Sequence, residues 1–141
     1  MDALIAAGGT PGPEEPLYSL TQGQPKALLE IAGKPIAQWV LDAVSSAGNI
    51  DNIVVVGLTE SDGLVSPKPV RYIPNQGGLL ENVLAGTGEL LKINPEAKYV
   101  VSVSSDVPAI QPEMIEWIVE TAEASDFDIY YSVITREAME A

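Results

Sequence analysis

The feature that most constrains the fold of this chain is a regular alternation of short apolar runs with longer stretches of helical spacing. The run 52–58 (NIVVVGL) is rich in β-branched residues and apolar at successive positions, which is typical of a strand buried on both faces of a sheet. Between such runs, apolar residues recur every three or four positions, as in a helix with one buried face. We expect strands at 3–7, 52–58, 70–73, 99–103 and 129–134, and helices at 36–47, 79–91 and 112–122.

Strands that alternate with helices indicate βαβ units, and therefore a Rossmann-like, three-layer α/β/α fold with a mostly parallel sheet. A length of 141 residues suits one domain, so we interpret 1–141 as a single domain. In such sheets, ligands bind outside the carboxyl ends of the strands, near the point where the strand order reverses. A binding site is therefore expected at that edge.

A glycine loop follows the first predicted strand. Gly8 and Gly9 end that strand, Gly12 comes shortly after, and Pro25-Lys26 opens the next apolar stretch. Glycine has no Cβ, so backbone N–H groups can approach an anionic ligand, and a returning lysine adds a positive charge suited to phosphate. The spacing matches neither G-x-x-x-x-G-K-[ST] nor G-x-G-x-x-G. A plain glycine turn beside a solvated lysine is therefore an alternative.

A single aspartate follows the fourth predicted strand, where Asp106 lies between Ser105 and Val107-Pro108. An aspartate in this position can cap the next helix. It can also face the glycine loop, because both segments follow the carboxyl ends of strands that we expect to be parallel. This convergence on one edge is the best evidence, from the residues alone, for a cleft that binds a ligand.

The amino-acid composition excludes several kinds of catalytic site, metal site and partner. The absence of histidine and cysteine excludes Ser-His-Asp and Cys-His catalysis and ordinary zinc sites, so a bound metal would be a hard ion on carboxylate oxygens, with Mg²⁺ the leading candidate. A net charge of −13 argues against nucleic acid or an anionic membrane as a partner. No apolar run approaches the ~20 residues of a membrane span. Because there is no cysteine framework and no basic signal sequence, we expect a cytoplasmic location. Lys68, Lys92 and Lys98 are interpreted as surface charges.

Three blocks of the chain resemble the sugar-phosphate and molybdopterin nucleotidyltransferases, whose NTP transferase domain has a GT-A-like fold. The family patterns are L-x-A-G-G-x-G, P-K-x-L and x-G-K-P, then a base-recognition loop with its helix, then an apolar strand ending in D-x-P. They occur here in the family's order and cover nearly the whole chain. The matching residues are Leu4, Ala6, Ala7, Gly8, Gly9, Gly12, Pro25, Lys26, Leu28, Gly33, Lys34 and Pro35, then 75–82, then 103–108.

The resemblance implies a Mg²⁺-dependent nucleotidyl transfer. A phosphorylated acceptor, either a sugar phosphate or a cofactor precursor, would attack the α-phosphate of an NTP, and pyrophosphate would leave. Lys26 and Asp106 would be catalytic, with Asp106 as the metal ligand. A homo-oligomer is compatible with the family. The implied nucleotide-binding residues are Ala6, Ala7, Gly8, Gly9, Gly12, Lys26, Gly78 and Asn82. Gly78 and Asn82 could instead be a loop glycine and a residue of the helix's first turn.

The chain also departs from the family pattern. The family's phosphate-contacting arginine after the glycine loop is missing, and Pro13, Glu14 and Glu15 occupy that stretch, where two carboxylates would repel a triphosphate. The family's catalytic domain continues to a second metal-binding aspartate, so we expect an amino-terminal, nucleotide-binding portion that lacks the carboxyl-terminal part. Two alternatives are a non-catalytic nucleotide-sensing module and a protein-interaction domain on the same fold.

Overall fold

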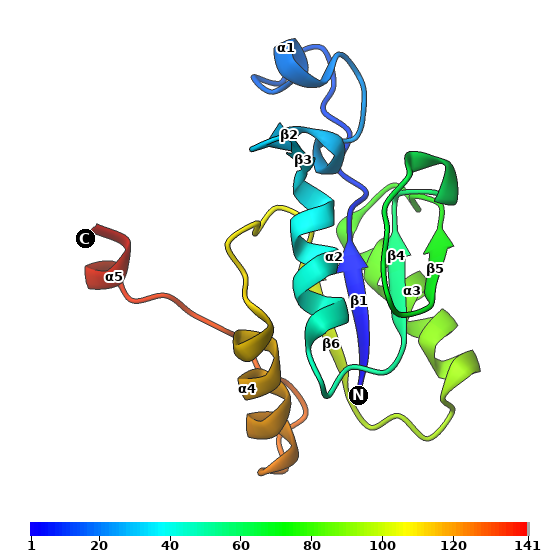
Figure 1. The fold of residues 1–141 in the computed structure, drawn as a ribbon, viewed down its shortest axis with the longest axis vertical. Helices are drawn as coiled ribbons and strands as arrows, with labels where there is room; N and C mark the ends of the chain where they lie inside the picture. Colours follow the sequence, from blue (N-terminus) through cyan, green and yellow to red (C-terminus); the bar gives the residue numbers. More distant parts are fainter. Residues whose placement is uncertain (141) are drawn as a thin grey trace.

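The computed structural model describes residues 1–140, which form a parallel four-stranded sheet. Its strands are β1 (Asp2–Ala6), β4 (Ile53–Val56), β5 (Val70–Ile73) and β6 (Val100–Ser104), in the order β5-β4-β1-β6 (Figure 1). The central strand β1 pairs in parallel with β4 on one side and with β6 on the other. Four of the five predicted strands are therefore confirmed, and so is the parallel arrangement of the sheet.

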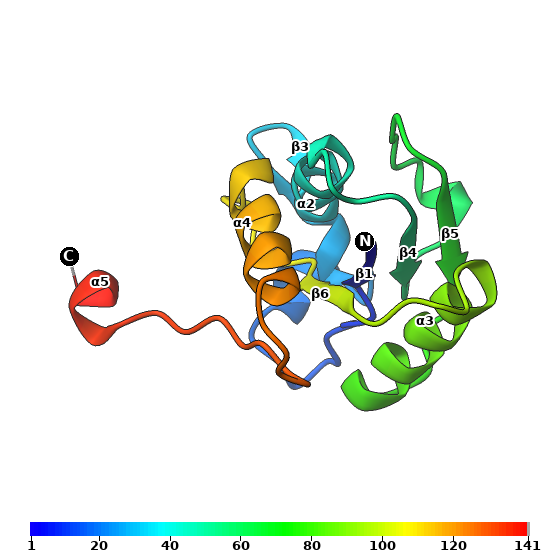
Figure 2. The same ribbon diagram turned by 90° about the horizontal axis from the view of Figure 1, so that it is seen from below.

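Three helices complete the layers. α2 (Ile36–Ser46) and α4 (Pro112–Glu123) cover one face of the sheet, and α3 (Leu79–Ile93) covers the other (Figure 2). Successive strand residues point to opposite faces. Ile5 accordingly packs on the α2 side while Leu4 and Val54 pack on the α3 side, each at most 1% exposed. The predicted α/β/α architecture is confirmed. Within residues 1–140, no helix combines the length and apolar character needed to cross a membrane.

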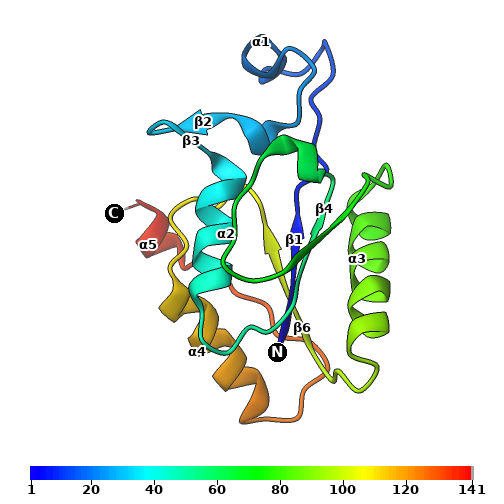
Figure 3. The same ribbon diagram turned by 45° about the vertical axis from the view of Figure 1, so that its right-hand side comes forward.

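Shorter elements lie beyond the carboxyl ends of the strands (Figure 3). The chain between β1 and α2 forms α1 (Tyr18–Thr21), the 3-10 turn η1 (Lys26–Leu28) and an antiparallel hairpin of β2 (Glu30–Ile31) and β3 (Lys34–Pro35). A second 3-10 turn, η2 (Glu60–Asp62), follows β4, and α5 (Arg136–Glu140) ends the described chain. Most of these extra elements therefore lie at the edge of the sheet where we expected a site.

The fifth predicted strand is wrong. Residues 129–134 form no strand in the described chain and extend away from the sheet toward α5 (Figures 1 and 2), with Ile129 83% and Val133 79% exposed. Tyr130 instead turns back, and its ring packs edge-on against Tyr99 while its hydroxyl donates to the Ala122 carbonyl. β-branched and aromatic composition gives only a local preference, and a strand also needs a neighbouring backbone with which to pair.

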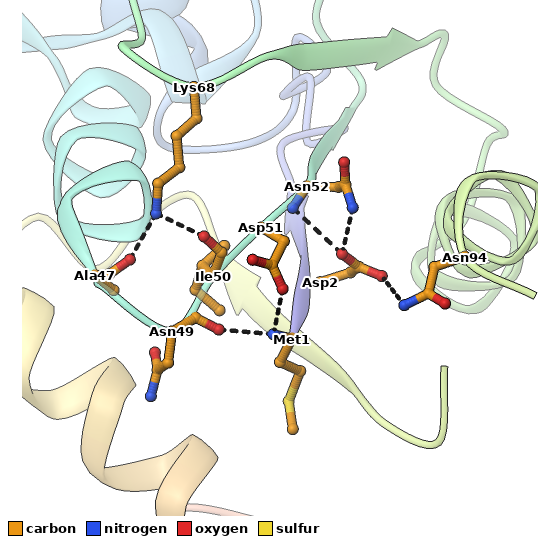
Figure 4. Close-up of polar contacts among 9 residues, drawn as sticks. All are labelled: Met1, Asp2, Ala47, Asn49, Ile50, Asp51, Asn52, Lys68 and Asn94. Atoms are coloured by element: carbon orange, nitrogen blue, oxygen red, sulfur yellow. Dashed lines mark hydrogen bonds and ion pairs between the residues drawn. The ribbon is translucent and has the colours of Figure 1, made fainter. Parts of the chain in front are cut away.

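Polar residues close the opposite end of the sheet (Figure 4). The Asp2 carboxylate is 1% exposed and accepts hydrogen bonds from the Asn52 backbone and side chain and from the Asn94 side chain, which ties β1 to the start of β4 and the end of α3. Lys68 is not the free surface charge that we expected. Its Nζ donates to the carbonyls of Ala47 and Ile50, 2.6 Å from each, in the turn that follows α2. A cation just beyond the last turn of a helix also suits the negative end of the helix dipole.

Two glycines of α3 differ in the space around them, which gives a test of the packing. A Cβ on Gly86 would overlap the Leu4 side chain, whereas a Cβ on Gly88 would meet open space. Gly→Ala in a helix is favourable by about 1 kcal/mol where there is room, and overpacking a core costs about 1–3 kcal/mol. We expect Gly88→Ala to raise the free energy of unfolding by about 1 kcal/mol and Gly86→Ala to lower it by about 1 kcal/mol. Urea denaturation measures both, and equal gains for the two variants would contradict this packing.

Candidate functional site

The strand order reverses beside β1, because β4 pairs with one of its edges and β6 with the other. The Ser105 N–H donates to the Ala6 carbonyl at 3.0 Å, so the pairing continues to the ends of both strands. The glycine loop after β1 and Asp106 after β6 therefore leave the sheet side by side. This is the point at which parallel α/β sheets bind their ligands.

A cavity of about 620 Å³ opens at this edge. This volume lies in the range of small-molecule sites. Six of the residues predicted to bind a nucleotide line it: Ala6, Gly8, Gly9, Lys26, Gly78 and Asn82. Ala7 is not a lining residue, because it is 1% exposed and belongs to the core. Gly12 lies further along the loop, where its N–H donates to a Glu15 oxygen at 2.8 Å. The structure thus brings most of the predicted binding set together.

Lys26 and Asp106, 80 residues apart in the sequence, form an ion pair beside the cavity. Lys26 Nζ lies 2.7 Å from Asp106 Oδ2, with the two side chains 35% and 44% exposed. The Lys26 backbone N–H donates to the Gly9 carbonyl at 2.9 Å, which returns η1 to the glycine loop. The capping role considered for Asp106 is wrong, because α4 begins after Gln111.

The electrostatics around Asp106 favour its ionised form. The hydrogen bond from Lys26, and after it the one from the Ser104 hydroxyl, hold the pKa of this carboxyl below its usual value. A lowered pKa means that the carboxylate persists through neutral pH and is lost only on strong acidification. Asp106 is therefore an anionic oxygen ligand at neutral pH, with Lys26 on one carboxylate oxygen and Ser104 on the other.

The side-chain oxygens at Asp106 suit a hard metal ion that is bound partly by the protein and partly by a ligand. No group of three or more carboxylates is close enough to bind a metal by itself within residues 1–140. The Asp106 carboxylate and the Ser104 hydroxyl nevertheless point to each other at the edge of the cleft. Mg²⁺ usually keeps several waters and binds one or two carboxylates together with substrate phosphates. The Asp106 carboxylate and the Ser104 hydroxyl therefore fit such an ion when a phosphate supplies the further oxygens.

An asparagine that the sequence analysis did not assign a role joins the two loops of the cleft. Asn75 Nδ2 donates to the Gly8 carbonyl at 2.8 Å, and its Oδ1 accepts from Asn82 Nδ2 at 3.0 Å. Asn82 is 5% exposed, and its Oδ1 accepts from the Gln76 backbone. The observed contacts of Asn82 thus order the loop 75–78. Asn75 follows the carboxyl end of β5, so the edge argument used for Asp106 could have identified it.

Gly57 is a second residue that the sequence analysis did not assign to the site. It follows β4 with a φ of 106°, and its N–H donates to the Ile73 carbonyl at 2.8 Å. A Cβ on Gly57 would overlap the backbone of Gly8 and Ala7. A conformation with such a φ and such a close approach suits glycine alone. Gly57 therefore determines where the glycine loop crosses the end of the sheet.

Comparison with known proteins agrees with this geometry. The family described as "MobA-like NTP transferase domain" matches residues 3–140. A 3-deoxy-manno-octulosonate cytidylyltransferase of Vibrio vulnificus is 32% identical over 111 residues, which are 77% of this chain and 43% of the relative. A probable molybdenum cofactor guanylyltransferase of Trichormus variabilis is 28% identical over 83% of this chain and 51% of its own.

Solved structures agree on the fold. A hypothetical transferase from Thermus thermophilus superposes with a TM-score of 0.65 at 30% identity, covering 86% of this chain and 46% of its own. A 4-diphosphocytidyl-2C-methyl-D-erythritol synthase at 22% identity has a TM-score of 0.63 and shares the fold. The chain spans about half the length of the curated relatives that it matches. Since the family match extends over nearly all of the sequence, the chain belongs to the MobA-like NTP transferase domain family of nucleotidyltransferases.

Proposed function

We propose that this chain is the nucleotide-binding part of a Mg²⁺-dependent nucleotidyltransferase, which transfers a nucleoside monophosphate from an NTP to a phosphorylated acceptor. The observation that carries the proposal is the meeting of Lys26 and Asp106 beside the glycine loop, at the reversal of strand order. The names of the relatives include cytidylyl and guanylyl transfer, so the nucleobase stays open. A sugar phosphate or a cofactor precursor as acceptor stays a prediction.

In this proposal the cleft acts by positioning the NTP and the acceptor and by stabilising the charge of the phosphates. Backbone N–H groups of the glycine loop and the Lys26 ammonium bind the phosphates of the NTP. An acceptor oxygen forms a bond to the α-phosphorus as the bond to the bridging β-phosphate oxygen breaks, and pyrophosphate leaves. Asp106 and Ser104 would hold a Mg²⁺ ion, which would neutralise phosphate charge when bound. A Mycobacterium tuberculosis protein with this fold, solved in complex with manganese, supports a divalent ion. Positioning and electrostatics of this kind need no nucleophilic side chain.

Binding without turnover is the second candidate. One observation favours it: glutamates occupy the stretch where the family's phosphate arginine is expected. Both candidates require the same nucleotide cleft, and they differ only in whether an acceptor is converted. A cytoplasmic location and self-association into a homo-oligomer stay predictions.

Thermal unfolding with ligands tests the cleft. We expect one of ATP, GTP, CTP and UTP to raise the melting temperature by a few degrees in the presence of Mg²⁺, since a ligand at 100 times its Kd adds about 2.7 kcal/mol. The Asp106→Ala variant should lose the part of the shift that requires Mg²⁺. No shift with any of the four nucleotides, in either protein, would reject the proposed function.

A further inference from the structure

Glu15 occupies a backbone donor of the glycine loop. Its Oε1 accepts from the Gly12 N–H at 2.8 Å, and its own N–H donates to the Gly12 carbonyl at 2.9 Å. The residue also lines the 620 Å³ cavity, together with Lys26. A carboxylate oxygen on a loop N–H makes the contact that an oxygen of a bound phosphate would make. Glu15 thus takes the place of an anion on its own loop.

The charged residues around the cavity determine how this contact affects the binding of phosphates. Within residues 1–140, Lys26 is the one cation and Glu15 the one carboxylate that line the cavity. Lys26 is already paired with Asp106 at 2.7 Å. With Glu15 and Asp106 beside this one lysine, the resting cleft has a surplus negative charge. Like charges a few ångströms apart repel even at the dielectric constant of water.

We infer that Glu15 is a specificity-determining residue, which competes with ligand phosphates for the Gly12 N–H and disfavours nucleotides according to their free phosphate charge. The inference rests on the proposed function, because it concerns the same cleft. It predicts that Glu15 leaves the affinity for a nucleoside unchanged and lowers the affinity for a triphosphate. Mg²⁺ reduces the difference because it neutralises the phosphates. The site would thus select the metal-bound triphosphate over the free one.

The neighbouring residue offers a matched control. Glu14 is exposed and makes no hydrogen bond or ion pair in the described part of the chain, and it does not line the cavity. Glu14→Gln and Glu15→Gln remove the same charge, one residue apart. Glutamine at position 15 can still accept a hydrogen bond from the Gly12 N–H, so Glu15→Gln alters the charge of the loop while leaving its turn in place.

The experiment is isothermal titration of the wild type and both variants with a nucleoside, its monophosphate and its triphosphate, each with and without Mg²⁺. The base is the one that gives the largest thermal shift. Without Mg²⁺ we expect Glu15→Gln to bind the triphosphate about tenfold more tightly than the wild type, the monophosphate with a smaller gain and the nucleoside unchanged. With Mg²⁺ the gain should shrink. Glu14→Gln should change every affinity by less than about twofold, because Glu14 does not line the cavity and salt screens a charge that lies outside it.

Two results would overturn the inference about Glu15 while leaving the proposed function intact. One is equal gains in triphosphate affinity for the two variants, which would show a general effect of net charge. The other is nucleoside and triphosphate binding that is identical in Glu15→Gln and the wild type. If no protein binds any nucleoside or nucleotide, the proposed function itself fails, and the inference fails with it. Circular dichroism of Glu15→Gln verifies that the variant keeps its fold.

Discussion

Replacing Asp106 with asparagine is expected to raise the affinity for a nucleotide without Mg²⁺ and to lower it with Mg²⁺. In the wild type, Asp106 Oδ2 holds Lys26 at 2.7 Å, so a phosphate must take the lysine from the aspartate. Asparagine frees Lys26, and without Mg²⁺ the variant should bind an NTP about 2–5-fold more tightly, the gain expected from removing a half-exposed ion pair. With Mg²⁺ it lacks the metal's anionic ligand and should bind about tenfold or more weakly, as for a lost contact to a charged group.

Asp126→Asn is the control for this prediction. Asp126 forms an ion pair with Lys98 at 2.5 Å, beyond the carboxyl end of α4 and outside the candidate cleft. The substitution removes the same charge from the same kind of pair, so NTP affinity should stay within about twofold of the wild type at either Mg²⁺ concentration. Fluorescence titration of the four variant and metal combinations measures the pattern. An Asp106→Asn protein that loses affinity equally with and without Mg²⁺ would exclude Asp106 as the metal ligand.

Gly57→Ala should be the most destabilising of the substitutions considered for this fold. Alanine at a φ of 106° is strained, and its Cβ would overlap the backbone of Gly8. Backbone strain of this kind costs about 1–3 kcal/mol, and the collision adds to it. We expect the free energy of unfolding to fall by about 3 kcal/mol or more, and the melting temperature by roughly 10 °C. The displaced glycine loop should also lower the affinity for any nucleotide.

Gly63→Ala separates the two causes of the expected destabilisation, which are backbone strain and overlap with a neighbouring segment. Gly63 has a φ of 75° at the end of η2, but a Cβ there would meet nothing within 4 Å. Only the strain of the left-handed conformation applies, which costs about 1–2 kcal/mol, and the affinity for a nucleotide should not change. Urea denaturation and nucleotide titration compare the two variants. Similar losses of stability in both would mean that the approach of Gly57 to Gly8 does not determine the position of the loop.

Local sequence patterns were sufficient for the layers of this fold and for two segments at its switch point. The run 53–56 is apolar at every position and is buried on both faces, as a central strand of a parallel sheet must be. The glycine loop and Asp106 could be placed at one edge because parallel strands share a carboxyl edge, whereas Lys26 was assigned from its return to that loop and from the family resemblance. That β1 and β6 are neighbours is known only from the structure. The catalytic and metal-binding roles of these two residues stay predictions.

The features that could not be predicted depend on contacts between distant segments. Gly57 looks like a glycine at the end of a strand until the loop at Gly8 is seen to cross it. Lys68 looks like a charge in a polar loop, but the carbonyls that it binds belong to the turn after α2. Residues 129–134 have the composition of a strand, yet no neighbouring strand pairs with them in the described residues. In each case the missing information was the position of a partner elsewhere in the chain.

The two ends of β1 differ in how firmly they are held. At the amino end, three hydrogen bonds to the buried Asp2 carboxylate connect the strand to β4 and α3. At the carboxyl end, the Gly8 and Gly9 carbonyls accept hydrogen bonds from the Asn75 side chain and the Lys26 backbone, and the one from Asn75 is exposed to solvent. Local opening is easiest where hydrogen bonds are exposed to solvent. β1 is thus held by a buried carboxylate at one end and by a more exposed loop at the other, so we expect the glycine loop to open before the core does.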